Sequence, residues 1–72
     1  MTDTQYLEKV IAESGKKKGY LADKLGISRQ SFHKKMTNSA CFSLKEVQVL
    51  CSELNITKLS VKNDIFFAND SD

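Results

Sequence analysis

Apolar residues recur at helical intervals along almost the whole chain, and the first such pattern spans residues 4–14. Its apolar side is one stripe formed by Leu7, Val10, Ile11 and Ser14. Thr2 and Gln5 fit a capping box at the start of this segment, and Gly15 suits a left-handed stop at its end. The pattern predicts a first helix.

Two shorter helices are predicted next, separated by a glycine turn. The apolar residues of the first are Leu21, Ala22 and Leu25. Gly26 ends it because glycine adopts positive φ at little cost, and Ile27 follows as a buried turn residue. Ser28 is a good N-cap for the next helix, in which Phe32 and Met36 are four residues apart and share one face.

The fourth predicted helix has the clearest local signal. Ser43 and Glu46 form an S-x-x-E capping box, and Phe42 and Val47 occupy the positions of a hydrophobic staple. Asn55 suits the end of the helix. We expect a buried stripe made of Leu44, Val47, Leu50, Cys51 and Leu54.

A fifth helix is expected from Thr57, as its cap, to about Asp64, with Ile56 and Leu59 facing inward. The chain contains no proline and shows no internal repeat or linker. Five helices should therefore share one core, which predicts an all-α fold with a single domain over residues 1–72.

The charge of the 72-residue chain is polarised although the net charge is only +2. Residues 1–40 hold eight Lys or Arg against four Asp or Glu, whereas residues 41–72 hold three against five. Within residues 16–35, seven positive groups face Asp23 alone. A run of lysines is often only a solvated surface, but this concentration favours a polyanion as partner.

Several classes of protein are disfavoured by the sequence. No apolar run has the roughly 18 to 20 residues that cross a bilayer, and the N-terminus lacks the regions of a signal peptide, so we expect a cytoplasmic protein with no membrane partner. Cys41 and Cys51 support neither a disulfide framework nor a metal site, and both are expected to be reduced and at least half-buried. We expect no enzyme, no cofactor and no small-molecule substrate, since phosphate loops and nucleophile–base pairs are missing.

The glycine turn between two short helices, one of them polar on one face, is typical of a helix-turn-helix, although an ordinary helical hairpin is the alternative. The stretch LADKLGISRQSF resembles the Cro and repressor-like (XRE-type) helix-turn-helix family of bacteria and their phages. The resemblance implies a five-helix, lambda-repressor-like domain with the motif at about residues 18–36. One departure is Lys35, which stands where the family has its second apolar residue, so that Met36 takes this role.

In that family the start of the third helix enters the major groove. The resemblance thus implies that Arg29 could pair with guanine and Gln30 with adenine. The candidate DNA-binding residues are Lys18, Ser28, Arg29, Gln30, Ser31, His33 and Lys34, with Lys16, Lys17 and Lys35 as further phosphate contacts. The alternative for each is an ordinary exposed side chain.

A second candidate surface is the C-terminal segment 64–72. Three large apolar residues in a row cannot all point inward from a short helix, so part of them should remain accessible as a partner site; alternatively they complete the core. The candidate partner-binding residues are Phe42, Asp64, Ile65, Phe66, Phe67 and Asp70. Phe42 serves either this patch or the staple.

The ending LNITKLSVKNDIFFA, together with KKGYLADKLGISRQ, is similar to small regulators of temperate phages of Gram-positive hosts. The similarity implies an antirepressor, which binds the DNA-binding domain of a partner lysogeny repressor and blocks its operator, and binds double-stranded DNA weakly alone. The alternative is a stand-alone, dimeric Cro-like repressor, which would present two copies to half-sites about 34 Å apart.

Overall fold

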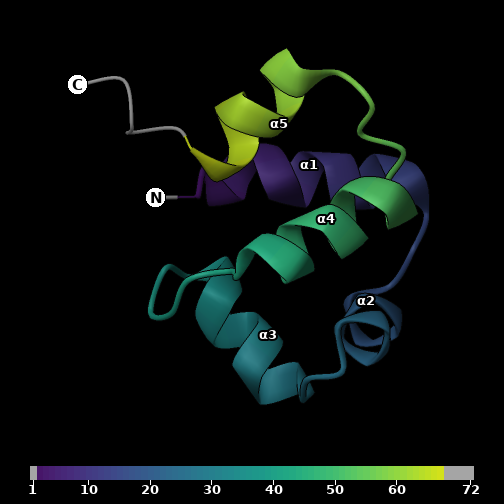
Figure 1. Cartoon of the computed structure of the whole chain (residues 1–72). Coiled ribbons are helices and arrows are strands. Elements are labelled where there is room, and N and C mark those ends of the chain that lie inside the picture. Colours follow the sequence, from purple (N-terminus) through teal and green to yellow (C-terminus); the bar gives the residue numbers. More distant parts are fainter. Residues whose placement is uncertain (1, 68–72) are drawn as a thin grey trace.

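The computed structural model describes residues 2–67, which form five helices and no strand. In chain order the elements are α1 (Thr4–Ser14), α2 (Lys18–Leu25), α3 (Arg29–Met36), α4 (Leu44–Glu53) and α5 (Leu59–Phe66). Figure 1 shows α4 between α1 and α5 on one side and α2 and α3 on the other. The predicted all-α class is confirmed, with five helices as expected.

The core lies where the apolar stripes of all five helices meet. Its buried residues are Leu7, Ile11, Leu21, Ala22, Phe32, Met36, Val47, Leu50, Leu54, Ile65 and Phe66. Every helix contributes at least two of them, so no helix is an appendage. Met36 is buried as expected.

Local signals set most of the helix ends. Gly15 and Gly26 both have positive φ after α1 and α2, and Asn55 has φ 57° after α4. The capping box of α4 is complete, because Ser43 accepts the Glu46 N–H and the Glu46 carboxylate accepts the Ser43 N–H. These four predictions are confirmed.

Two helix starts differ from the expectation. The cap of α1 is Asp3, whose carboxylate accepts the Tyr6 N–H at 3.1 Å, rather than Thr2 with Gln5. The N-cap position of α5 is Lys58, without a side-chain bond, rather than Thr57, and this helix continues to Phe66. A carboxylate is a strong cap, so Asp3 competes successfully with its neighbour Thr2.

The inward positions of two leucines were predicted wrongly. Leu44 and Leu59 are 70% and 68% exposed, although the periodicity places both on apolar stripes. Each is the first residue of its helix, α4 or α5. The end of a helix can extend past its neighbours, and a correct helical phase does not then bury the side chain.

Candidate functional site

The corner between α2 and α3 is a tight turn of three residues, Gly26 to Ser28. Gly26 has φ 73°, and its N–H donates to the Asp23 carbonyl at 3.0 Å. The N–H of Ile27 donates to the Ala22 carbonyl at 3.1 Å. Ala22 is only 1% exposed, so the two helices approach closely at this point. Backbone bonds and close packing together fix the angle between α2 and α3.

The start of α3 is capped by Ser28, whose hydroxyl accepts the Ser31 N–H at 3.1 Å. Phe32 and Met36 anchor one side of this helix in the core. Ser28 and Ser31 thus serve the local structure first, although the Ser28 side chain is exposed. The opposite side of α3 is left open.

That open side carries four exposed polar residues, which lie together around one shallow hollow: Arg29, Gln30, His33 and Lys34. All four were sequence candidates for DNA binding. Spacings of three and four residues place them on adjacent turns of one helix face. The structure therefore brings the core of the candidate set together.

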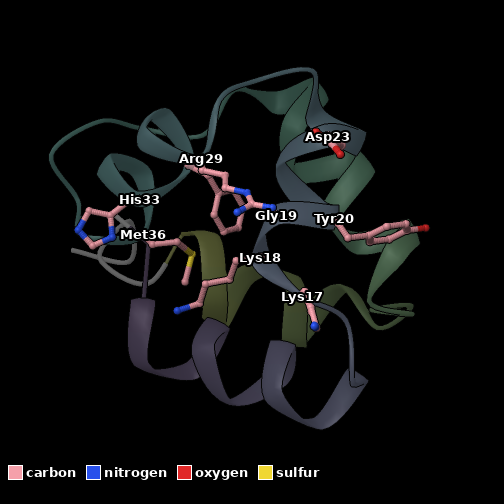
Figure 2. Close-up of a pocket in the computed structure, with 9 residues that line it drawn as sticks. Lys17, Lys18, Gly19, Tyr20, Asp23, Arg29, His33 and Met36 are labelled. Carbon is pink, nitrogen blue, oxygen red and sulfur yellow. The ribbon is translucent and has the colours of Figure 1, made fainter.

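A groove of about 650 Å³ separates this face from the first turn of α2. It is lined by Lys17, Lys18, Gly19, Tyr20, Asp23, Arg29, Phe32, His33 and Met36. Figure 2 shows the guanidinium of Arg29 extending from α3 toward Gly19 on α2. The groove is mostly cationic at its rim and apolar at its base, where Phe32 and Met36 lie.

Three lysines of the basic stretch are engaged in ion pairs rather than directed outward. Lys16 pairs with Glu53 at 3.1 Å, Lys18 with Glu8 at 2.8 Å, and Lys35 with Glu46 at 2.6 Å. The sequence had suggested all three lysines as DNA contacts. These pairs instead join α2 to α1, and they join the α1–α2 connection and α3 to α4.

The pair of Lys35 with Glu46 is the most enclosed of the three. Both side chains are largely buried, at 16% and 14% exposure, and the ammonium contacts both carboxylate oxygens. Burial alone would raise the pKa of Glu46, but the hydrogen bonds from Lys35 and Ser43 more than offset it, so the pKa lies below its ordinary value. This pair attaches α3 to the capped start of α4.

A second network surrounds the end of α4. The Lys16 ammonium donates to the carbonyl and to the carboxylate of Glu53, and the Tyr20 hydroxyl donates to the same carboxylate at 3.0 Å. Hydrogen bonds from Lys16 and then Tyr20 lower the pKa of Glu53. The network holds the start of α2 beside the end of α4, so its function is positional.

Among residues 2–67, Arg29, Lys34 and Lys17 make no ion pair. All three are exposed, and they lie on α3 or at the N-cap of α2. These three unpaired cations border the α2–α3 groove or the open side of α3, whereas other unpaired lysines of the described residues, such as Lys9, Lys45 and Lys58, lie on other elements. Nothing in the sequence distinguished these three from the paired lysines, because the carboxylates that pair with lysine are 10 to 37 residues away.

The C-terminal candidate surface is largely internal. Ile65 is 0% and Phe66 5% exposed, and the Phe66 ring packs edge-to-face against Phe42 with centroids 6.0 Å apart. Both residues therefore belong to the core, and the expectation that they form an accessible patch is corrected. Asp64 is exposed and Phe67 half-buried, whereas Asp70 lies outside the described residues.

A different apolar surface appears next to this segment. A groove of about 250 Å³ is lined by Thr2, Asn38, Cys41, Phe42, Leu44, Val47, Phe66 and Phe67. Leu44 and Cys41 are exposed along it, and Phe42 and Phe67 are half-buried. We call this the Leu44 groove. The sequence analysis included Phe42 and Phe67 in the candidate surface. It missed Leu44 because the spacing of apolar residues placed this residue on the buried stripe of the helix.

Other chemistry is sparse in the part of the chain that the structure describes. No group of three His, Cys, Asp or Glu side chains is close enough there to hold a metal ion. Cys41 is exposed, contrary to expectation, and Cys51 is half-buried, with burial raising the pKa of its thiol. Within residues 2–67 no helix has both the length and the apolar character needed to cross a membrane.

Comparisons with protein-family models, with curated proteins and with solved structures found no match to this chain.

Proposed function

We propose that the chain is a transcriptional regulator of the helix-turn-helix type, with α2 and α3 as the motif and duplex DNA as a ligand. The observation that carries the proposal is the open cationic face of α3 beside the α2–α3 groove. A helix held at a fixed corner, apolar on one side and polar or cationic on the other, suits insertion into the major groove.

The residues fit distinct tasks in such a complex. Gln30 and Lys34 are exposed one turn apart on α3, where an amide can pair with adenine and an ammonium with guanine. Lys17, at the N-cap of α2, suits a phosphate. Lys16 and Lys35 are removed from the list of contacts because their ammonium groups are engaged by carboxylates. Lys18 would first have to release Glu8, an exposed pair that contributes little.

DNA binding is tested by measuring the affinity of the chain for a duplex selected from a random-sequence pool. We expect affinity to fall steeply with salt, and Lys34→Ala to weaken binding. The matched control is Lys58→Ala, which removes the same charge from an exposed position at the start of α5. Equal losses in the two variants would show a nonspecific charge effect and contradict the proposal.

We further propose that the regulator acts as an antirepressor of a phage-type switch, binding a partner repressor and blocking its operator site. The support is the resemblance to small phage regulators, together with the exposed apolar Leu44 groove on the side of α4 near α5. Burial of Ile65 and Phe66 moves the proposed contact to Phe42, Leu44 and Phe67. An exposed apolar groove of this kind is typical of a surface that binds protein.

Two exposed leucines provide the test of this part. Leu44 and Leu59 each begin a helix and are almost equally exposed, at 70% and 68%. Leu44→Ser should reduce co-purification with a phage-type repressor expressed in the same cells and shown to bind the unchanged chain, whereas Leu59→Ser should not. Retention of the partner by both variants would exclude the Leu44 groove as the contact.

The alternative is a stand-alone Cro-like repressor that uses the same groove to form a homodimer. A lone small helix-turn-helix has limited affinity, so this alternative requires two copies on one operator. Sedimentation equilibrium separates the two functions. A monomer at micromolar concentration with weak, salt-sensitive DNA binding favours the antirepressor, and a dimer dispersed by Leu44→Ser favours the repressor.

A further inference from the structure

Arg29 begins α3 and lines both the hollow on the open side of this helix and the α2–α3 groove, and its guanidinium extends toward the groove. It lies against Gly19 in the first turn of α2, across the groove (Figure 2). A Cβ atom added to Gly19 would meet Nε of Arg29 at 2.7 Å, Nη2 at 2.8 Å and Cζ at 2.9 Å. At these distances the guanidinium occupies the space that a side chain at position 19 would take, and such a side chain would make the flexible end of Arg29 move away.

Gly19 has no conformational reason to be glycine. It is inside α2, and it is absent from the residues with positive φ, unlike Gly15 and Gly26. Alanine is a better helix former than glycine in such a position. The missing side chain is therefore useful for the space it leaves, and that space holds Arg29.

The place of the guanidinium decides what it could contact on DNA. In a docked helix-turn-helix the first helix crosses the sugar–phosphate backbone, and only the second enters the groove. A cation held on the first turn of α2 therefore faces phosphates. We propose that Arg29 is a phosphate contact positioned by Gly19, and that base reading belongs to Gln30 and Lys34. This inference rests on the proposed DNA binding.

The neighbouring charges agree with this role. The Lys18 ammonium is turned to Glu8 on α1, which leaves the guanidinium of Arg29 and the ammonium of Lys17 as the unpaired cations among the residues that line the groove. Asp23 also lines the groove, one turn after Gly19, but within residues 2–67 it forms no ion pair with Arg29. The guanidinium donors are thus available to an external anion.

The first experiment compares Arg29→Ala with Gln30→Ala on a duplex selected by the unchanged chain and on a scrambled duplex of equal length. Arg29→Ala should weaken both by a similar factor of about ten and reduce the slope of log affinity against log salt by about 0.9. Gln30→Ala should weaken the selected duplex only. Loss of discrimination in Arg29→Ala, with the salt slope unchanged, would overturn the proposal.

The second experiment uses Gly19→Ala, which displaces the guanidinium without removing it. The variant should fold, and it should bind both duplexes more weakly than the unchanged chain, with a loss no larger than that of Arg29→Ala. The double variant should bind no more weakly than Arg29→Ala alone, because both changes remove one contact. Binding by Gly19→Ala at the level of the unchanged chain would contradict the positioning role.

A third measurement needs no DNA and separates this inference from the proposed function. Gly19→Ala should raise the melting temperature more in the Arg29→Ala background than in the unchanged chain, because only there is the space free for a methyl group. Equal shifts of the melting temperature in the two backgrounds would refute the packing of Arg29 on Gly19. If the two substitutions are coupled in their effect on the melting temperature but the chain binds no duplex, the packing of Arg29 on Gly19 is retained. The phosphate role of Arg29 and the proposed DNA binding are then both refuted.

Discussion

The third and fifth helices have the same length, eight residues, and the sequence suggested a binding surface on each. The structure treats them differently. On α3 the polar side of the helix remains exposed and collects Arg29, Gln30 and Lys34. On α5 two of the candidate partner-binding residues, Ile65 and Phe66, are buried, which is the alternative in which they complete the core.

The difference follows from what each helix packs against. The two buried residues of α3, Phe32 and Met36, are four apart and lie on one stripe, so a single contact surface satisfies them. Ile65 and Phe66 are adjacent and point about 100° apart, which requires contacts on two sides. The structure supplies both, because α5 lies along α1 and the Phe66 ring reaches Phe42. The Asp3 N–H also donates to the Ile65 carbonyl at 2.6 Å.

This comparison shows that a run of apolar residues near a chain end is a weak indication of a partner site in a small domain. A chain of 72 residues has few elements with which to close a core, and it uses every large side chain that it can.

The largest effect should come from Phe66→Ala. Removing a buried aromatic ring costs about 3 to 5 kcal/mol, a large part of the stability of a domain this small. Urea denaturation followed by circular dichroism measures the loss. Leu59→Ala, at an exposed position on the same helix, should change stability by less than about 0.5 kcal/mol. Similar small losses in both variants would show that the C-terminal segment does not belong to the core.

The adjacent lysines of α3 provide a second test within one helix. Lys35→Ala leaves the largely buried Glu46 carboxylate without its ammonium and should cost about 1 to 3 kcal/mol. Lys34→Ala should cost less than about 0.5 kcal/mol, because the residue is exposed and unpaired among residues 2–67. DNA affinity should show the opposite order, because Lys34→Ala should weaken binding more than Lys35→Ala does. If Lys34→Ala destabilises the fold as much as Lys35→Ala, the division between internal and external cations on α3 is wrong.

Much of the helical framework was predictable because its signals are local. Gly26 and the box of Ser43 with Glu46 encode ends of helices within four residues of sequence, and the structure forms both. Burial of Phe32 and Met36 followed from their spacing alone. These predictions depend only on neighbours along the chain, and distant contacts did not override them.

The site was less predictable because charge alone does not tell an internal ion pair from an external contact. Lys34 and Lys35 are consecutive in sequence, yet only Lys35 is within reach of a carboxylate. The position of Arg29 on Gly19 depends on the angle between α2 and α3, which no sequence spacing specifies. The exposure of Leu44 depends on how far α4 extends past its neighbours, a property of the assembled domain.

The pH dependence of stability should report the enclosed ion pair. The pKa of Glu46 is lowered in the folded chain, so its contribution is present above the unfolded value of about 4.3 and is lost as pH falls through the folded value. Glu46→Gln should flatten this acid limb, the fall in stability toward low pH, in urea denaturation between pH 6 and pH 3. Asp64→Asn, at an exposed position on α5, should leave the limb unchanged. An unaltered acid limb in Glu46→Gln would contradict the stabilising role of the pair.

The smallest expected effect separates the α2–α3 groove from α5 by charge alone. Asp23→Asn and Asp64→Asn each raise the net charge by one, but Asp23 lines the α2–α3 groove, whereas Asp64 is on α5. Near the groove the removed carboxylate no longer repels phosphates, so Asp23→Asn should raise the affinity for any duplex about two- to fivefold at low salt. The gain should fade at high salt, where charges are screened within a few ångströms. Equal gains from the two variants would mean that DNA responds to the net charge of the domain and not to the face of α3.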